Sequence, residues 1–456
     1  MHVPDPQPRL MSPSGGFPHL SRRGLLAGAA TVGLSGSLAG CSTLSAGLAG
    51  GEVAPGTVQF WNLFGGGDGA RLQGMLDVYR KAHGPNSLEA ATFSWGNPYY
   101  TKVTLATLGG HPSDVAISHA TRAVNLARGG LLEPITDDML ALAGLKPTDF
   151  SEIPWKAGQV DGQQYTIPLD THPFVLYYNV DVCQKAGLMD GDKLKPIVGL
   201  DQWEAALTAA KKVTGQFGCA VPTIGDTASC WRWLTTLYHQ QEGATPFLSD
   251  GGRDLSWNED LALKTLTLMQ KWTKAGLMPK NTDYPGAQTL MFTGKAGFYL
   301  MGVWEITTAQ SIKGLKFGMT AIPTLFDKAA TQGDSHTFVL PRMNRDEAQL
   351  KRAMGFVKAM LDQSIAWAKG GHVPAYVPAV QSKEFTSLEP QKNYADVVKT
   401  VTYDAQAWYS GSGSTFENII GAQIGLVEQG LTSPQRALDS ARSQLSTYAK
   451  TADPLG

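Results

Sequence analysis

The sequence has few cysteines and no residues at the spacing of a metal site. Its four cysteines show neither CxxC nor zinc-finger spacing, and its nine histidines are scattered, with no ligand pair on a helix face. Charge is also scarce: charged residues make up 17% of the chain, the formal net charge is -1, and no basic block is present. Nucleic acid requires clustered lysine and arginine, so neither a metal site nor a nucleic-acid partner is predicted.

Catalytic signatures are missing as well. The chain contains no HExxH, GxSxG, SxxK or GK[ST] motif. One motif could indicate an enzyme. Gly65, Gly67 and Ala70 fit the GxGxxG/A pattern of dinucleotide-binding folds, with Glu89 about twenty residues further on. This signal is weak, since residues 62–65 separate the strand from the glycine turn and nicotinamide cofactors belong in the cytoplasm. No cofactor and no enzyme activity are predicted.

What is present is the composition of a globular protein. With 456 residues, 43% of them hydrophobic, the chain exceeds one core, so two domains are expected. Segments of strand character alternate with amphipathic helices, which predicts an α/β fold with a parallel-type sheet covered on both faces. Asp68 is expected to cap the first helix, and Asp161-Gly162 to form a hairpin turn. The clearest helices are expected at 68–83, 201–213, 260–276 and 345–362.

The N-terminus predicts export. Paired Arg22-Arg23 precede an uncharged run, 24–40, that is too Gly- and Ala-rich for a stable membrane span and resembles a Tat signal peptide. "LAGC", ending at Cys41, resembles a bacterial lipobox; the alternative is a plain signal peptide with an incidental cysteine. We expect residues 1–40 to be removed, Cys41 to carry lipid on the outer face of the cytoplasmic membrane, and residues 41–56 to form a flexible tether.

The remaining cysteines are then Cys183, Cys219 and Cys230. An export compartment permits disulfides, and Cys219 with Cys230 would close a short loop. One thiol is left over whichever pair forms.

Several motifs in order resemble a known family. "VQFWNLFGGG", "SDVAISHATRAVNLARGGLLEPI", "DGQQYTIPLDTHPFVLYYNVDVCQKAGL", "FTGKAGFYLMGVWEI", "FGMTAIPT" and "GGHVPAYVPA" follow the pattern of family 1 extracellular solute-binding proteins of the carbohydrate type. The resemblance runs from about Thr57 to the C-terminus. It implies the capture subunit of an ABC importer, a monomer that works with permease subunits.

The resemblance also implies the architecture. Members have a periplasmic-binding-protein-like α/β fold (type II) of two lobes joined by three crossings, closing on the ligand. The crossings would lie near Pro168, Pro323 and His372. One lobe would then comprise residues 57–167 with 325–372, and the other 168–324 with 373–456.

The best candidate for ligand contact is Trp304. It follows a buried strand that ends at Gly302, and loops at the carboxyl ends of such strands line the ligand cleft. Its ring can stack on the apolar face of a sugar, although a core tryptophan is the alternative. Further candidates follow by position in the family: Asn62, Phe64, Ser118, His119, Asp170, His172, Trp231, Glu305, His336, His372 and Phe416.

Some of these positions carry specific alternatives. Each lone histidine could have only a structural role, and His172 stands where maltose binders place an acidic ligand residue, which argues against a maltose-like pattern. Trp231 is preferred over Trp233, because residues two apart on a helix cannot both point inward. The predicted function is carbohydrate capture for import. One alternative is capture of a glycerophosphodiester, for which Arg122 is the only cation placed near the cleft. Another is an exported glycoside hydrolase using Asp170 and Glu305.

Overall fold

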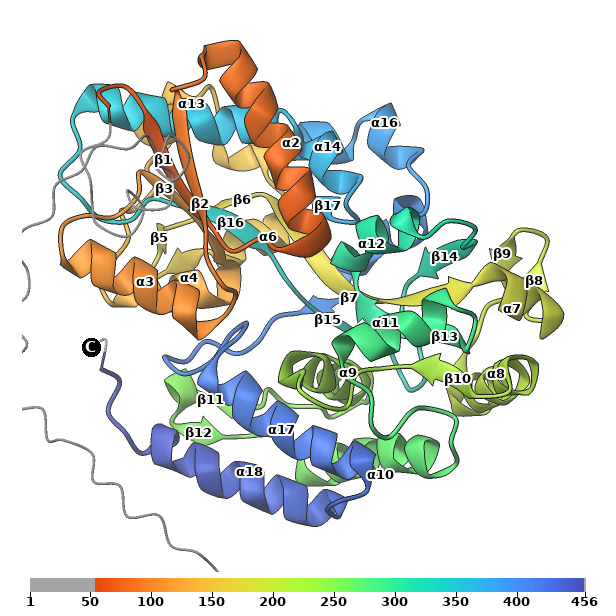
Figure 1. Cartoon of the computed structure of the whole chain (residues 1–456). Helices are drawn as coiled ribbons and strands as arrows, with labels where there is room; N and C mark the ends of the chain where they lie inside the picture. The colour runs from red at the N-terminus through yellow and green to blue at the C-terminus, as the bar shows by residue number, and fades with distance from the viewer. Residues whose placement is uncertain (1–53, 455–456) are drawn as a thin grey trace, which may run out of the picture. The chain divides into compact units, whose positions relative to one another are not determined.

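The computed structural model describes residues 54–454. The predicted signal peptide, the lipid-bearing Cys41 and most of the tether lie outside the described residues. Within the described residues, no helix has the length and apolar character needed to cross a bilayer. Two hydrophobic cores are present, each built around its own sheet, and we call the two parts the first and second lobe (Figure 1).

The first lobe is built on a five-stranded sheet with the order β2-β1-β3-β16-β6. Its strands are β1 (Val58–Asn62), β2 (Leu88–Thr92), β3 (Val115–His119), β6 (Ile167–Pro168) and β16 (His336–Val339). Its main helices are α2 (Gly66–His83), α3 (Asn97–Leu108), α4 (Ala120–Arg128), α5 (Asp137–Leu142), α6 (Glu152–Ala157), α13 (Glu347–Leu361) and α14 (Ser364–Ala368). Leu72, Met75 and Leu76 line the buried side of α2, at the helical spacing that its sequence shows.

The second lobe is built on the sheet β10-β13-β7-β15-β18, with β14 and β17 also paired to β7. Its strands are β7 (Asp170–Asn179), β10 (Phe217–Ala220), β13 (Ala296–Gly302), β14 (Phe317–Thr320), β15 (Thr331–Asp334), β17 (Val373–Pro374) and β18 (Val401–Thr402). Its main helices are α7 (Val180–Lys185), α8 (Gly199–Thr214), α9 (Thr227–His239), α10 (Glu259–Lys274), α11 (Tyr284–Phe292), α12 (Ile306–Ser311), α17 (Thr415–Gln429) and α18 (Pro434–Ala449).

The predicted parallel-type sheet is only partly correct. Strand β1 runs parallel to β2 and β3, and β10 runs parallel to β13. Strand β16 is antiparallel to β3, and β7 is antiparallel to β13, β14 and β15. Strands that arrive from the other lobe enter a sheet from the opposite end, which makes both sheets mixed.

The chain changes sheets between β6 and β7, at Leu169, and between β15 and β16, at Ser335. The predicted crossing near Pro323 is therefore wrong, because β15 still pairs with β7. The segment before β15 stays on the second lobe, where Gln240 donates hydrogen bonds to the carbonyls of Pro323 and Ala330. The other lobe boundaries and the number of hinge crossings stay predictions.

Two local predictions have opposite outcomes. The hairpin turn at Asp161-Gly162 is confirmed: β4 (Gln159–Val160) pairs antiparallel with β5 (Gln163–Gln164), and both turn residues have positive φ. The predicted cap by Asp68 is wrong. Helix α2 begins at Gly66 with Gly65 as N-cap, so Asp68 lies in the first turn and its carboxylate faces His372 instead.

The predicted Cys219–Cys230 disulfide is not formed. Cys183, Cys219 and Cys230 are all buried free thiols. The Sγ atom of Cys219 lies 3.4 Å from the carbonyl of Ala220, whereas Sγ of Cys230, on α9, lies 3.6 Å from the carbonyl of Pro222. Burial raises the pKa of both thiols, which keeps them protonated and unreactive.

Candidate functional site

Four histidines meet where strands pass between the lobes. His119 ends β3, His172 lies at the start of β7, His336 begins β16 and His372 precedes β17. Strand register brings them together, because His336 pairs with His119 across β16 and β3, while His172 pairs with Asp334 across β7 and β15. All four side chains are buried.

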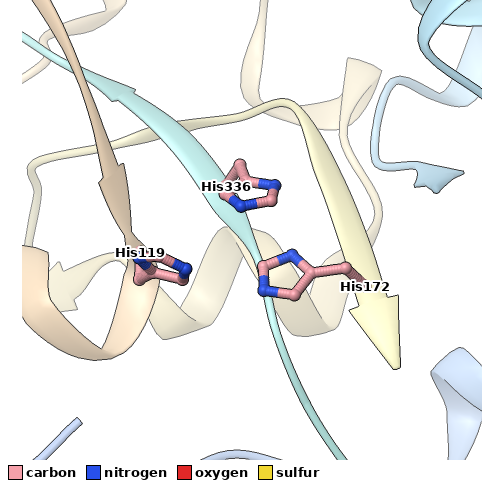
Figure 2. A group of neighbouring side chains, drawn as sticks. All are labelled: His119, His172 and His336. Carbon is pink, nitrogen blue, oxygen red and sulfur yellow. The ribbon is translucent and has the colours of Figure 1, made fainter. Parts of the chain in front are cut away.

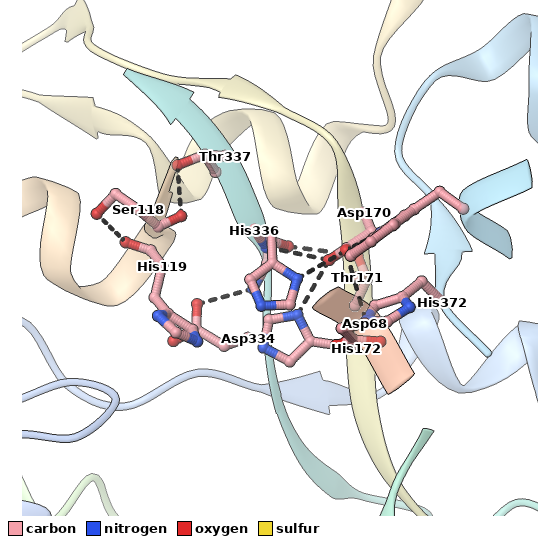
Figure 3. Close-up of polar contacts among 12 residues, drawn as sticks. Asp68, Ser118, His119, Asp170, Thr171, His172, Asp334, His336, Thr337 and His372 are labelled. Carbon is pink, nitrogen blue, oxygen red and sulfur yellow. Dashed lines mark hydrogen bonds and ion pairs between the residues drawn. The ribbon is translucent and has the colours of Figure 1, made fainter. Parts of the chain in front are cut away.

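Asp170 holds this group together (Figure 3). Its side chain is fully buried, at 0% exposure. Its Oδ1 accepts hydrogen bonds of 3.0 Å from Nδ1 of His172 and from the backbone N–H of His336. Its Oδ2 accepts from Nδ1 of His336 at 2.8 Å and from the indole N–H of Trp367 at 2.6 Å. Both carboxylate oxygens are therefore fully used inside the protein, and Asp170 orients two imidazoles.

Burial and charge set the protonation of these groups. Burial raises the pKa of Asp170, but His336, His372 and the histidine hydrogen bonds lower it more, so its pKa lies well below the ordinary value. Burial, followed by the proximity of His336, lowers the pKa of His172 to about 3. Burial also lowers the pKa of His119, again with His336 as the next cause. His119 and His172 are thus neutral at pH 7.

His372 behaves differently. Burial lowers its pKa, but the carboxylates of Asp68 and Asp170 raise it more, and the net pKa lies above the ordinary value. Its Nε2 lies 3.4 Å from Oδ2 of Asp68 and 3.9 Å from Oδ2 of Asp170. The ring also stacks on Trp367, with centroids 4.4 Å apart. His372 is therefore paired with two carboxylates, which favour its protonated form.

The other three imidazoles converge on one another. The rings of His172 and His336 are stacked, with centroids 4.0 Å apart, and His119 lies 5.0 Å from His336 and 5.4 Å from His172. Figure 2 shows a ring nitrogen of each pointing toward the space between them. Nδ1 of His119 lies 2.8 Å from Oη of Tyr100, which places Tyr100 behind this ring as Asp170 lies behind the other two.

Trp304 lies beside this group, 6.0 Å from the ring of His172 between centroids. Its indole N–H donates to Oη of Tyr284 at 2.9 Å, and Tyr284 donates in turn to Glu305. Glu305 is therefore linked to the Trp304 ring through Tyr284. Gly302 is required here, because a Cβ atom at this position would lie 2.0 Å from the Trp304 ring. The hydrogen bond to Tyr284 holds the ring of Trp304 in place. Because Trp304 is only partly buried, the ring is still accessible.

Arg232 was missed by the sequence reasoning, which considered only its neighbours. Its guanidinium lies 5.1 Å from the ring centroid of Trp304 and 6.0 Å from that of Trp95. Trp95, in the loop after β2, is 42% exposed and lies 6.3 Å from His119. The sequence did contain a signal for Arg232. It stands between Trp231 and Trp233, and an arginine in such an apolar helical segment is unusual.

Trp231 and Phe416 line a different space. Their rings contact at 5.0 Å, and the indole N–H of Trp231 donates to Asp404 at 2.9 Å. Both border a cavity of about 370 Å³ within the second lobe, which Phe247, Tyr403 and Asp404 also line. Trp233 is fully buried against Trp272. Trp231 thus borders this cavity and does not join the group around Trp304, so its predicted role in ligand contact, like that of Phe416, stays a prediction.

The remaining candidates of the first lobe support the site from behind. Phe64 packs against the rings of His336 and Trp367, with centroids 4.7 and 4.8 Å away. Asn62 accepts from the N–H of Phe64 at 3.1 Å and so shapes the loop after β1. Ser118 donates to the carbonyl of His119 at 3.0 Å. These two polar side chains are engaged within their own lobe.

Polar contacts join the lobes next to the histidines. Thr121, on α4, donates its hydroxyl to Asp334 and accepts at 3.1 Å from the N–H of Ser412. Arg122 donates to the carbonyl of Ser412 at 3.4 Å and to Asn97 at 3.2 Å, so its charge is used in this junction. Burial raises the pKa of Asp334 to about 7.

The chemistry available is recognition by rings and hydrogen-bonding groups. Hydrolysis of a glycoside requires two carboxylates facing each other across the bond. Asp170 is saturated with hydrogen bonds, and Glu305 is bound by Tyr284 and Gln288, with burial raising the pKa of Glu305. Both carboxylates are thus engaged by neighbouring side chains in this arrangement.

Comparison with known proteins identifies the family. A family model described as bacterial extracellular solute-binding protein matches residues 75–396, most of the chain, and the chain belongs to this family. The predicted family is confirmed, and its extracellular place agrees with the predicted export. No curated protein gives a significant match.

Solved structures share the fold. The GacH receptor of Streptomyces glaucescens, solved without ligand and with acarbose, matches with a TM-score of 0.72 and 17% identity over 86% of this chain and 98% of that one. The sugar-binding protein MalE of Xanthomonas citri gives 0.69 and 16% over 86% and 97%. The cyclic alpha-maltosyl-1,6-maltose binding protein of Arthrobacter globiformis gives 0.66 and 19% over 88% and 100%. The two-lobed α/β fold is thereby confirmed.

Proposed function

We propose that the protein captures a carbohydrate between its lobes and delivers it to an ABC permease, without chemical change. The observation that carries this proposal is Trp304, a partly accessible ring held by Tyr284 beside a buried group of hydrogen-bonding imidazoles. A sugar needs this combination, because its C–H face is apolar and its hydroxyls need partners around the edge. Three neighbours in fold are described as binding acarbose, sugar or a cyclic maltosyl saccharide.

Neutral imidazoles suit this task. A neutral histidine offers one donor and one acceptor, as a sugar hydroxyl does, and does not require a charged partner. The lobes would open by breaking contacts such as Thr121 to Asp334 and Thr121 to Ser412, which involve few residues. Closing would then enclose the solute, and the closed form would be the one that the permease recognises.

A thermal-shift screen of the purified protein against mono- and oligosaccharides tests the proposal. A solute present at 100 times its Kd stabilises by about 2.7 kcal/mol, which for a chain of this size raises Tm by roughly 3 °C. We expect such a shift for at least one sugar in the parent protein and a smaller one in Trp304→Ala. The proposal fails if no sugar shifts Tm while another solute class does.

Arg232 favours a second candidate, an anionic solute such as a glycerophosphodiester. Its guanidinium lies near Trp95 and Trp304 and has no hydrogen bond to another described residue, so an anion can use its donors, in competition with the nearby carboxyls of Asp404 and Glu417. Aromatic rings at the same place can hold a quaternary ammonium. Glycerophosphodiesters belong in the same screen, and Arg232→Gln separates the two classes: affinity for a phosphodiester is lost, whereas neutral-sugar affinity falls less.

Absence of catalysis is part of the proposal and has its own test. Prolonged incubation of the protein with its best ligand should return the ligand unchanged, as judged by mass spectrometry. A cleaved product that disappears in Asp170→Asn or Glu305→Gln would establish a hydrolase instead.

Anchoring by lipid on Cys41 completes the proposal. It rests on the twin arginine and lipobox in the sequence. A tether of small residues after Cys41 would let the folded lobes approach the permease while the acyl chains stay in the membrane.

A further inference from the structure

Three imidazoles in this protein have the arrangement of metal ligands. One ring nitrogen from each of His119, His172 and His336 lies within 4.8 Å of the others. The three residues come from three different strands, so their positions are set by the sheets and not by a mobile loop. Figure 2 shows the three rings next to one another, each on its own strand.

The hydrogen bonds behind the rings leave the inner nitrogens available. His172 and His336 both donate from Nδ1 to Asp170, which fixes the tautomer that carries a lone pair on Nε2. Nε2 of each of these rings has no hydrogen-bond partner among residues 54–454. A carboxylate that receives the outer N–H of a histidine is the usual support of a metal-binding imidazole. Tyr100 lies at the corresponding place behind Nδ1 of His119 and can accept its proton.

We propose that His119, His172 and His336 bind one divalent transition-metal ion of the zinc class. Three imidazole ligands with one coordination position left open are typical of zinc sites that bind a further group. Zinc–nitrogen bonds of 2.0–2.1 Å place tetrahedral ligand atoms roughly 3.3 Å apart. From a spacing of 4.8 Å or less, each nitrogen has to move by at most about 0.9 Å to reach this geometry. The rings of His172 and His336 are stacked 4.0 Å apart with planes 23° apart, so one of them also has to turn out of the stack before both Nε2 lone pairs point at one ion.

Asp170, His336 and His372 form a second group of the same size, but it is less suitable. Asp170 already accepts four hydrogen bonds, from His172, His336 and Trp367. His372 faces Asp68 with its Nε2. A metal there would displace bonds that hold the site together, whereas the first group offers nitrogens without partners. The proposed metal therefore belongs to the first group, and the proposal departs from the expectation from histidine spacing that no metal is bound.

The open coordination position would take an oxygen atom of the solute. The ring of His172 lies 6.0 Å from that of Trp304, so a solute stacked on Trp304 would lie next to this imidazole. This second part rests on the proposed function, whereas the metal site itself does not.

Metal binding is tested with the protein produced without a polyhistidine tag and stripped by a chelator. Titration with Co²⁺ should show one equivalent bound, with the intense visible absorption of a four-coordinate ion, and Zn²⁺ should displace it. His172→Ala and His336→Ala should abolish the absorption. His119→Gln, at the end of β3, serves as a further variant in case the first two fail to fold, which circular dichroism checks. His111→Ala is the matched control, because His111 is an exposed histidine outside the group.

Two results would overturn the metal site: absence of saturable one-to-one binding, or the same binding in folded His119→Gln as in the parent. The proposal that the solute coordinates the metal is tested separately, by measuring solute affinity with and without the metal. We expect the solute identified by thermal shift to bind at least tenfold more weakly to chelator-treated protein than to protein reloaded with Zn²⁺. Equal affinity in both would show that the metal takes no part in solute recognition, and the carbohydrate proposal would stand. A protein that binds Zn²⁺ but no sugar would support the metal site and contradict the carbohydrate proposal.

Discussion

Glu428 offers a direct test of how burial acts in this fold. It lies on α17, fully buried in the second lobe. Neither carboxylate oxygen has a hydrogen-bond partner of normal geometry in the described part of the chain, and the neighbouring thiol of Cys230 is only a weak donor. Burial raises the pKa of Glu428 to about 8, against a small opposing effect of Cys230. The folded protein therefore keeps this carboxyl neutral at pH 7.

This pKa determines the sign of the effect on stability. The ordinary pKa of the side chain is 4.5, so between pH 4.5 and about 8 the folded state holds a proton that the unfolded state has lost. Stability then falls as pH rises through this window. Between pH 5 and pH 8 the loss is at most about 3.5 kcal/mol, from about 1.36 kcal/mol per pKa unit. For a chain of this size it corresponds to roughly 4 °C in Tm.

The assay is thermal unfolding of the parent and of Glu428→Gln at pH 5 and at pH 8. Glutamine stays neutral, so the variant should gain up to roughly 4 °C relative to the parent on going from pH 5 to pH 8. Other buried acids, such as Glu417 and Asp334, titrate in both proteins and cancel in the difference. Glu347→Gln, at an exposed position, is the control and should leave the difference near zero. A parent and a Glu428→Gln variant with parallel Tm profiles over this range would refute the reasoning.

Three further predictions follow from the site and the N-terminus. Trp304→Ala should weaken solute binding by about 2 kcal/mol, roughly thirtyfold by calorimetry, with little change in the Tm of the unliganded protein; unchanged affinity would place Trp304 outside the site. Gly302→Ala should push the Trp304 ring aside and cost about 1–3 kcal/mol of stability together with affinity, whereas Gly355→Ala, where a Cβ meets nothing within 4 Å, should be neutral or slightly stabilising by thermal unfolding. Cys41→Ser should release the protein from the membrane fraction, as immunoblotting of cell fractions would show, and unchanged membrane association would count against lipidation.

Local patterns in the sequence were sufficient for several elements of secondary structure. Helical spacing of apolar residues predicted α2, α8, α10 and α13, and each is present. The Asp161-Gly162 turn was predicted from two residues, because only a few residue types tolerate positive φ at both positions. Ordered motifs also predicted the family. These features depend on neighbours in the chain, so a single sequence contains them.

Strand direction and the crossing at Ser335 were not predictable in this way. Whether a strand runs parallel or antiparallel depends on which end of the sheet it enters, and this depends on the path of the chain between the lobes. Residues around Pro323 resemble a crossing in the sequence, but Gln240 from a distant helix holds that segment on the second lobe. Such contacts join residues far apart in the chain and leave no periodic pattern.

The sequence by itself determined the family and several strands and helices, and it singled out Asp170, His172 and Trp304 as candidates. Only the tertiary structure decided that four scattered histidines meet around one carboxylate, that Arg232 and not Trp231 lies against Trp304, and that Glu305 acts through Tyr284. The physical reason is strand register. His119, His172 and His336 are far apart in the chain, and they become neighbours because hydrogen-bonded pairing aligns β3 with β16 and β7 with β15.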